Sequence, residues 1–199
     1  MQNYVDGSLA QEMRSATAEQ KVDALFNYME ERGQSFYDEV VTQLEHALQC
    51  AALARQNDAS PTLITSALLH DLGHFILDEH NADTTFLAMD LNHEEIGAEY
   101  LAPFFPEIVT TPIRLHVPAK RYLCATDASY HDGLSEASKR SLKVQGGIMS
   151  DEERKAFEQI PHFRDALTLR RWDDLAKVSG LETAGLGTYR DTVQQCLIH

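Results

Sequence analysis

Apolar residues recur at three- and four-residue intervals along most of the chain, which is the pattern of amphipathic α-helices. The first clear example contains Val22, Leu25, Phe26 and Met29, and Gly33 follows it as a stop signal. The same pattern predicts helices at about 40–57, 60–68, 92–105, 107–126, 135–145 and 164–177, one that begins at Ser150, and a short one after Gly187. Alternating apolar and polar runs of strand length do not occur in the sequence, so it predicts an all-α fold.

Capping residues mark several of these boundaries. The expected caps are Ser60 followed by Pro61, Asn92, Ser135, and Ser150 in a capping box with Glu153. Pro112 and Pro118 are expected to disturb the helix at 107–126. The stretches 78–90 and 127–134 are short of core residues and are predicted to be loops that border a site. The whole chain, 1–199, is predicted to form a single domain.

The charge of the chain excludes some classes of partner. Lys and Arg total 17 against 31 Asp and Glu, which gives a formal net charge of −14. Such a chain would be repelled by nucleic acid or by an anionic membrane, so neither is an expected partner. The three cysteines lack the C-x-x-C spacing of a zinc site, and no signal peptide or membrane-spanning stretch is evident. A cytoplasmic location is therefore expected.

A His-Asp pair, His70 and Asp71, ends one predicted helix in SALLHDLGHF. An imidazole nitrogen beside a carboxylate can bind or bridge divalent metal ions, although a helix C-terminus also favours a histidine through its dipole. His46 lies 24 residues earlier, and His93 and His116 follow at successive intervals of 23 residues. Any one of these histidines, taken alone, fits a surface or core role better. Four predicted helices that each present one histidine, however, indicate a metal site inside a helical bundle.

Further polar residues accompany these candidates. Asp173 and Asp174 in RRWDD are candidates for a last oxygen ligand. Three polar residues lie one helical turn from a candidate ligand and are expected to project beside it: His74 near His70, Lys120 near His116 and Arg170 near Asp173. Cations placed around the metals of an acidic protein favour a negatively charged substrate group. The alternative, in which Lys120 and Arg170 are solvated or paired with surface acids, fits the spacing equally well.

The ordered set of ligands resembles the HD-domain superfamily, whose common members are metal-dependent phosphohydrolases. Its two additional histidines resemble more closely the oxygenase branch, which includes myo-inositol oxygenase and the diiron oxygenases that cleave organophosphonates. The segments that carry the resemblance lie between about 37 and 177 and read VTQLEHALQCA, LLHDLGH, NHEEIGAEYL, LHVPAKRYLC, LSEASKRSLKVQGG and LRRWDDLAK. The resemblance implies an HD-type helical bundle with the metal site in this part of the chain.

It also implies roles for individual residues. Two irons, with Asp71 as the bridge, would be held by His46, His70, Asp71, His93, His116 and Asp173. Asp173 is preferred to Asp174 and Asp165 because it follows the Trp as in the family. The positions that contact the substrate phosphonate correspond to His74, Lys120, Ser138 and Arg170. Tyr37 and Glu39 resemble a lid pair whose Tyr occupies an iron until substrate arrives, although the family spacing would place that Tyr at Phe36.

The implied reaction is O2-dependent cleavage of a carbon–phosphorus bond. The substrate would be a 1-hydroxy-2-aminoethylphosphonate or its trimethylammonio relative, and the products phosphate with glycine or glycine betaine. An Fe(II)/Fe(III) pair would supply the redox chemistry. The main alternative is an HD phosphohydrolase that acts on a nucleotide or phosphate ester with a metal-activated water. A third hypothesis is a metal-bound helical sensor or scaffold without turnover.

Overall fold

The computed structural model describes residues 5–36, 40–77 and 92–198, and these residues form an all-α fold. The helices are α1 (Ser8–Arg14), α2 (Ala18–Arg32), α3 (Gln43–Gln56), α4 (Pro61–Leu69), α5 (Leu72–Ile76), α6 (His93–Leu101), α7 (Glu107–Thr126), α8 (Ala128–Gly133), α9 (Glu136–Val144), α10 (Asp151–Phe157), α11 (Phe163–Leu175), the 3-10 helix η3 (Leu186–Tyr189) and α12 (Arg190–Gln194). One isolated antiparallel bridge joins Phe36 to Thr42.

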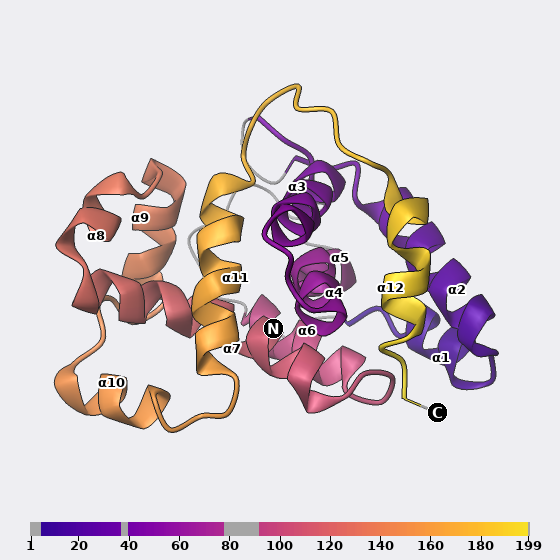
Figure 1. Cartoon of the computed structure of the whole chain (residues 1–199), viewed down its shortest axis with the longest axis horizontal. Helices are drawn as coiled ribbons and strands as arrows, with labels where there is room; N and C mark the ends of the chain where they lie inside the picture. Colours follow the sequence, from indigo (N-terminus) through magenta and orange to yellow (C-terminus); the bar gives the residue numbers. More distant parts are fainter. Residues whose placement is uncertain (1–4, 37–39, 78–91, 199) are drawn as a thin grey trace.

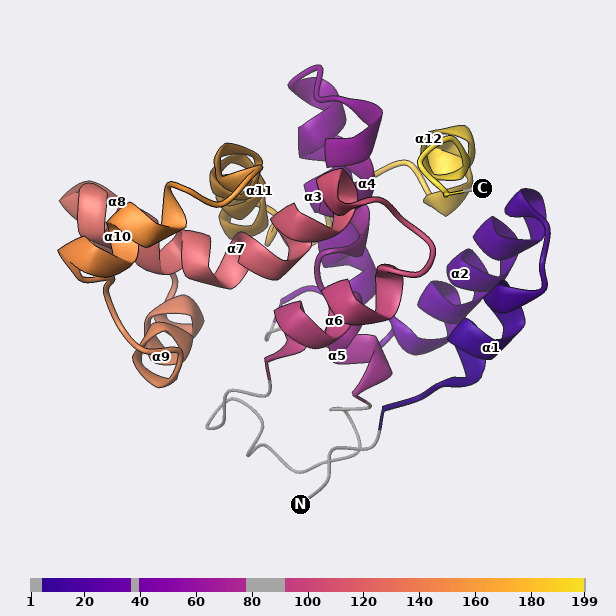
Figure 2. The ribbon, with the colours of Figure 1, turned by 90° about the horizontal axis from the view of Figure 1, so that it is seen from below.

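The helices that carry the candidate ligands pack against one another in the middle of the molecule (Figure 1). The most extensive packing joins α7 to α11 and to α6, α3 to α4, α4 to α7, and α5 to α6. Figures 1 and 2 both place α8, α9 and α10 at one end of the molecule and α1, α2 and α12 at the other. The arrangement brings together residues that are far apart in the sequence.

The large hydrophobic core lies under the central helices and the N- and C-terminal helices. Its largest fully buried side chains include Tyr189, Phe75, Phe105, Leu68 and Leu72. A smaller cluster joins α7 to α10 and α11, and consists of Leu115, Ala119, Met149, Phe157 and Ala166. A third cluster, made of Cys124, Leu134 and Leu142, attaches α9 to the end of α7. The segment around α8 to α10 is thus held on α7 and α11 by apolar contacts of its own.

Most of the expected helix boundaries are confirmed. The Ser60 side chain caps α4 by accepting from Leu63 N–H, with Pro61 in the first turn. Ser150 and Glu153 form the expected capping box of α10. Gly33 ends α2, and a Cβ at this position would lie 2.8 Å from the Cβ of Leu44. Two further capping boxes, at Thr17 and Thr42, were not predicted from the sequence.

The structure corrects the expected loop at 127–134. This stretch contains α8, because the Asp127 side chain accepts from the backbone N–H groups of Ser129 and Tyr130 and so begins a helix. The other expected loop, 78–90, lies outside the described residues.

Two expectations about helix geometry also differ from the structure. Pro112 and Pro118 lie within α7, which extends from Glu107 to Thr126 as one helix. Packing of α7 against α4, α6 and α11 offsets the hydrogen bonds that the prolines remove. Asn92 occupies the N-cap of α6, but its backbone is left-handed, with φ of 53°, and its side chain does not cap the helix. Among the described residues, no helix combines the length and the apolar character needed to cross a membrane.

Candidate metal centre

The four expected histidines come from four different segments and meet in two pairs. His46 lies in α3 and His70 directly follows α4, and their Nε2 atoms are 3.2 Å apart. His93 begins α6 and His116 lies in α7, and their Nε2 atoms are also 3.2 Å apart. Three of these residues are at most 1% exposed, and His93 is 8% exposed.

Asp71 lies between the two pairs. Its Oδ2 is 3.4 Å from Nε2 of His46 and 3.3 Å from Nε2 of His70. Its Oδ1 is 3.4 Å from Nε2 of both His93 and His116. The carboxylate is buried, and neither oxygen has a hydrogen-bond partner within the described part of the chain. One carboxylate oxygen therefore faces each histidine pair, which is the arrangement of a ligand shared by two metal ions.

A second carboxylate, Asp173 from α11, joins one of the pairs. Its Oδ1 is 3.5 Å from Nε2 of His46, and the ligand atoms of His46, His70 and Asp173 all lie within 4.8 Å of one another. Asp174 instead pairs with Arg170, and Asp165 lies 3.5 Å from His162 at the surface. Among the three acids considered in α11, Asp173 is the one placed at the cluster.

Contacts behind the rings orient the histidines. The Nδ1 atoms of three of them lie within hydrogen-bond distance of backbone carbonyls: His46 to Ala176 at 2.8 Å, His70 to Ala67 at 2.9 Å and His116 to Ile113 at 2.7 Å. A carbonyl only accepts, so each Nδ1 carries the proton and each Nε2 is the atom available to a metal. The Nδ1 of His93 instead faces a carboxylate, that of the buried Glu94, at 3.5 Å.

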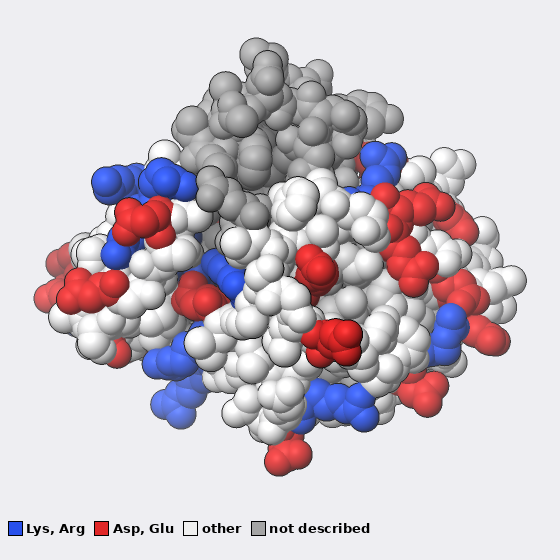
Figure 3. All heavy atoms as spheres, turned by 90° about the horizontal axis from the view of Figure 1, so that it is seen from above, with Lys and Arg blue, Asp and Glu red and all other residues white. Residues whose placement is uncertain are grey.

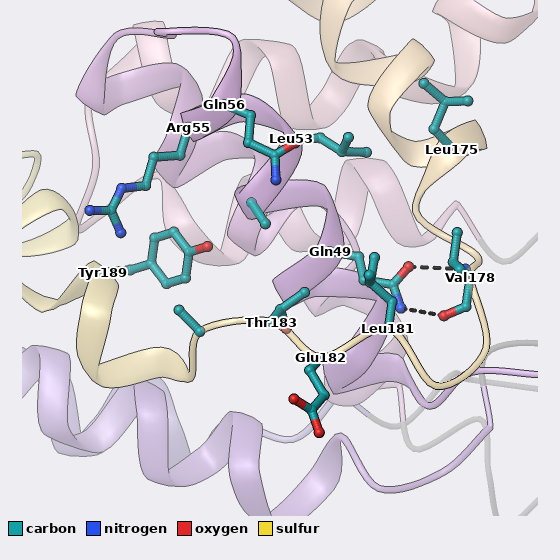
Figure 4. Close-up of a pocket in the computed structure, with 12 residues that line it drawn as sticks. Gln49, Leu53, Arg55, Gln56, Leu175, Val178, Leu181, Glu182, Thr183 and Tyr189 are labelled. Atoms are coloured by element: carbon teal, nitrogen blue, oxygen red, sulfur yellow. Dashed lines mark hydrogen bonds between the residues drawn. The ribbon is translucent and has the colours of Figure 1, made fainter.

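The carbonyl that orients His46 belongs to a segment that Gln49 fixes in place. Gln49 lies one turn after His46 in α3 and donates to the carbonyl of Val178 at 2.8 Å, while Val178 N–H donates back to it at 3.0 Å (Figure 4). These two bonds hold the chain after α11 against α3, at the edge of the groove drawn in that figure. The Ala176 carbonyl is thereby kept behind His46.

Two glycines bring α5 and α6 together at the second pair. A Cβ on Gly73 would lie 2.0 Å from the carbonyl oxygen of His93, and a Cβ on Gly97 would lie 3.0 Å from the backbone nitrogen of Gly73. Only a residue without a side chain allows this approach. It sets His93 beside Asp71 and stacks its ring on that of His74, with ring centroids 3.8 Å apart.

The electrostatics of the cluster suit a metal ion. Burial raises the pKa of the Asp71 carboxyl, but the surrounding histidines, His70 foremost, outweigh burial and hold this pKa well below its usual range. Burial lowers the pKa of His46, yet the nearby carboxylates of Asp173 and Asp71 outweigh burial and raise this pKa to about 9. Burial holds the pKa of His116 well below its usual value, so this ring is neutral. A metal ion bound at His46 would displace a proton there.

The donor set fits two metal ions of the iron type. His46, His70 and Asp173 provide two imidazoles and a carboxylate, and His93, His116 and Asp71 provide the same combination. Two histidines and one carboxylate, with remaining positions open, are typical of non-haem iron oxygenases. The Asp71 oxygens are buried and have no hydrogen-bond partner among the described residues, and a positive ion between them and the converging Nε2 atoms would give them one.

Buried cationic side chains lie near Asp173, the second carboxylate of the cluster. Lys120 is 2% exposed, and its Nζ donates to Ser141 Oγ at 2.7 Å and to Gln145 Oε1 at 2.6 Å. Burial, followed by the charge of Arg170, lowers the pKa of Lys120 to about 7. Arg170 is 3% exposed, and its Nη1 lies 2.6 Å from Asp173 Oδ2. Crowded, buried cations favour an anionic ligand.

Lys177 adds a cation to which the sequence analysis gave no role. Its Nζ lies 3.8 Å from Asp173 Oδ1 and 3.4 Å from the Oγ of Ser138, which is buried near the start of α9. Lys177 follows the end of α11, and its spacing of four residues after Asp173 was a usable signal. Ser141 and Gln145, the partners of Lys120, carried no signal of this kind because they belong to a different helix.

The remaining expected site residues divide into two groups. His74 lies at the cluster, and its ring, Asp71 and His93 have ligand atoms within 4.8 Å of one another, so it is close to the second pair as well as to the expected substrate position. Tyr37 and Glu39 lie outside the described residues.

Comparison with known proteins places this site in a family. The HD domain family matches residues 44–139. The hydroxymethylphosphonate dioxygenase of Gimesia maris is 56% identical over 185 residues, which cover 93% of this chain and 92% of the relative. The chain belongs to the phosphonate-cleaving family of HD-domain oxygenases.

Two other relatives extend across most of the chain. A protein of Leisingera caerulea, named [1-hydroxy-2-(trimethylamino)ethyl]phosphonate dioxygenase (glycine-betaine-forming), is 42% identical over 175 residues, covering 87% of this chain and 89% of the relative. An uncharacterized protein, L432, of Acanthamoeba polyphaga mimivirus is 38% identical over 182 residues, covering 89% of this chain and 82% of the relative. The expected membership of the phosphonate-cleaving oxygenase branch is thus confirmed.

Proposed function

We propose that this protein is an O2-dependent dioxygenase that cleaves the carbon–phosphorus bond of a 1-hydroxyalkylphosphonate at a two-iron centre. The observation that carries the proposal is Asp71, whose two buried oxygens each face one histidine pair. Relatives named as phosphonate dioxygenases support the same reaction. The irons would be held by His46, His70, Asp71, His93, His116 and Asp173. When bound, they would supply the binding of O2 and its redox chemistry.

The protein side chains would bind and orient the substrate. Lys120, Arg170, Ser138 and His74 would contact the phosphonate. In support, His74 stacks on His93, Arg170 contacts Asp173, and Lys120, Arg170 and Ser138 are buried. Lys120 and Arg170 would neutralise its charge, and a phosphonate fixed in this way would hold the adjacent C1 carbon at the His and Asp cluster. Burial of these groups also excludes water from the reacting carbon.

The reaction balances without any further reductant. For hydroxymethylphosphonate, the C–P bond and one C–H bond break, one oxygen atom of O2 is added to carbon and the other to phosphorus, and the products are formate and phosphate. The four electrons that O2 accepts come from the substrate. For a 1-hydroxy-2-(trimethylammonio)ethylphosphonate the same balance gives glycine betaine, and for the 2-amino compound it gives glycine.

Hydroxymethylphosphonate and 1-hydroxy-2-(trimethylammonio)ethylphosphonate are the substrates to compare first. Both share the 1-hydroxyphosphonate unit, and the relatives named for them are 56% and 42% identical to this chain. We expect the iron-loaded protein to release phosphate from at least one of them in air and from neither under nitrogen. Phosphate release from nucleotides under nitrogen, with none from either phosphonate, would instead indicate a phosphohydrolase.

The surface and the cysteines bear on partners and location. On the described part of the face in Figure 3, Lys and Arg side chains lie scattered among acidic ones, which agrees with the net charge of −14 and offers no basic tract to nucleic acid. Cys50, Cys124 and Cys196 are free and buried, and reduced cysteines favour a cytoplasmic location.

Removal of the Lys120 charge should weaken phosphonate binding while leaving the metals in place. The lost charge-assisted hydrogen bond corresponds to a decrease in affinity of about 10- to 150-fold in Lys120→Met. Hydroxymethylphosphonate binding under nitrogen and iron content would be measured together. Lys139→Met is the matched control, because Lys139 pairs with Glu136 on the outer part of α9. An unchanged affinity in Lys120→Met would show that Lys120 does not contact the phosphonate.

Lys120 should also make the stability of the protein depend on pH. Its pKa of about 7 in the folded state lies below its ordinary value of 10.5, so between these values the unfolded chain binds one proton more than the folded chain. Stability therefore rises with pH in this window. The free energy of unfolding of the wild type, relative to Lys120→Met, should increase by about 2 kcal/mol from pH 7 to pH 9. Denaturant titrations of both proteins in the same metal state measure it, and a difference that is constant with pH would contradict the lowered pKa.

A further inference from the structure

Arg170 is held by two residues that belong neither to the proposed metal ligands nor to the proposed phosphonate contacts, Tyr130 and Asp174. Its Nε lies 3.1 Å from Asp174 Oδ2 and 3.3 Å from the Tyr130 hydroxyl, and its Nη2 contacts Asp174 Oδ1. The Tyr130 hydroxyl in turn donates to Asp174 Oδ2. Tyr130 comes from α8 and Asp174 from α11, so the contact links two helices.

Through these contacts, different nitrogens of the guanidinium group bind different carboxylates. Asp174 takes the edge formed by Nε and Nη2, while Nη1 lies against Asp173 Oδ2 at 2.6 Å. Among the described residues, these contacts use three of the five N–H groups of the arginine, and one N–H on each terminal nitrogen remains for a ligand. With both ends of the group fixed, these remaining N–H groups have a fixed direction.

Asp174 also limits how much of the Arg170 guanidinium group can bind Asp173, the proposed metal ligand. A free Arg170 could turn its forked edge to Asp173 and bind both carboxylate oxygens. Because Asp174 occupies this edge, Arg170 contacts Asp173 through one nitrogen, and Asp173 Oδ1 still faces His46 at 3.5 Å. Burial and the Asp174 charge outweigh the effect of Arg170 and raise the pKa of Tyr130, so its hydroxyl keeps the proton that it donates.

We propose that Tyr130 and Asp174 are positioning residues that hold the Arg170 guanidinium in the orientation in which it binds the substrate phosphonate. The inference rests on the proposed function, because it takes the phosphonate to be the ligand of Arg170. The proposal gives α8 a function, although this helix carries no proposed metal ligand: it would supply the Tyr130 hydroxyl that contacts Arg170.

Removal of the Tyr130 hydroxyl should loosen Arg170 without removing any ligand of the metals. In Tyr130→Phe we expect the KM for hydroxymethylphosphonate to rise about 3- to 10-fold, with kcat and iron content close to those of the wild type. Asp174→Asn removes the charge that holds the guanidinium, and its KM should rise about 10- to 100-fold.

Tyr122→Phe is the matched control, because Tyr122 donates to Glu158 at 2.7 Å on the surface, away from Arg170. It should leave KM unchanged, although it removes the same kind of hydrogen bond. A Tyr130→Phe protein with the KM of Tyr122→Phe, or one that loses iron in place of substrate affinity, would overturn the proposal.

A binding measurement separates this proposal from the proposed reaction. Hydroxymethylphosphonate is titrated under nitrogen into the iron-loaded wild type, Tyr130→Phe and Tyr122→Phe, so that no turnover is needed. Weaker binding by Tyr130→Phe alone supports the positioning role, even if the wild type then releases no phosphate in air. Equal binding by all three proteins overturns the positioning role, even if the wild type is an active oxygenase.

Discussion

Replacement of Asp71 by alanine is expected to leave the protein unable to hold either metal ion and to abolish phosphate release. Each oxygen of this carboxylate faces one histidine pair and lies 3.3–3.4 Å from the two Nε2 atoms of that pair. The change therefore removes a ligand from both metal positions at once. The loss of metal affinity should exceed the roughly 100-fold that the loss of an outer-shell partner costs. Metal content after iron loading and desalting measures it.

Asp165→Ala is the control for this experiment. Asp165 lies in α11, the helix that also carries Asp173, and pairs with His162 at the surface, so its removal deletes a carboxylate without touching the cluster. It should bind the same number of irons per chain as the wild type. Asp71→Ala protein that retains two irons per chain would contradict the role of Asp71 as the bridge.

Replacement of Gly73 by alanine is expected to destabilise the protein and to displace His93. The added Cβ would lie 2.0 Å from the carbonyl oxygen of His93 and 2.7 Å from its carbonyl carbon, and backbone atoms cannot move aside without shifting α6. Overpacking of this kind costs about 1–3 kcal/mol, and occasionally more. Because His93 begins α6, the shift should also weaken the metal position formed by His93 and His116.

Denaturant unfolding and metal content test this prediction together. Gly187→Ala is the control, since a Cβ at Gly187 would meet no atom within 4 Å. It should unfold close to the wild-type midpoint and bind the same amount of iron. If Gly73→Ala behaved in the same way, the close approach of α5 and α6 would not be what places His93.

Local signals in the sequence were sufficient for most helix boundaries, and they singled out the four histidines that the structure brings together. Ser60 and Ser150 cap their helices because the cap depends on residues within one turn. The histidines could be recognised because each lies in, or directly after, a different predicted helix, and a bundle brings such helices together. In contrast, 127–134 was expected to be a loop from its composition, whereas the capping side chain of Asp127 begins a helix there.

The partners of the site residues could not be predicted, because they depend on long-range packing. Lys120 is held by Gln145, 25 positions later, and Arg170 by Tyr130, 40 positions earlier. No periodicity connects such residues, and their contacts arise only when α8 and α9 fold against α7 and α11. The approach of Gly73 to His93 is of the same kind, since a glycine within LLHDLGH gives no sign of the backbone that it faces.

The most direct test of the proposed reaction is to measure O2 consumption and phosphate release together on the iron-loaded protein. With hydroxymethylphosphonate or 1-hydroxy-2-(trimethylammonio)ethylphosphonate as substrate, the balance of atoms and electrons predicts that one O2 is consumed for each phosphate released. No added reductant is needed. Phosphate released from any substrate without consumption of O2 would contradict the oxygenase reaction and assign the buried carboxylate and its four histidines to hydrolysis.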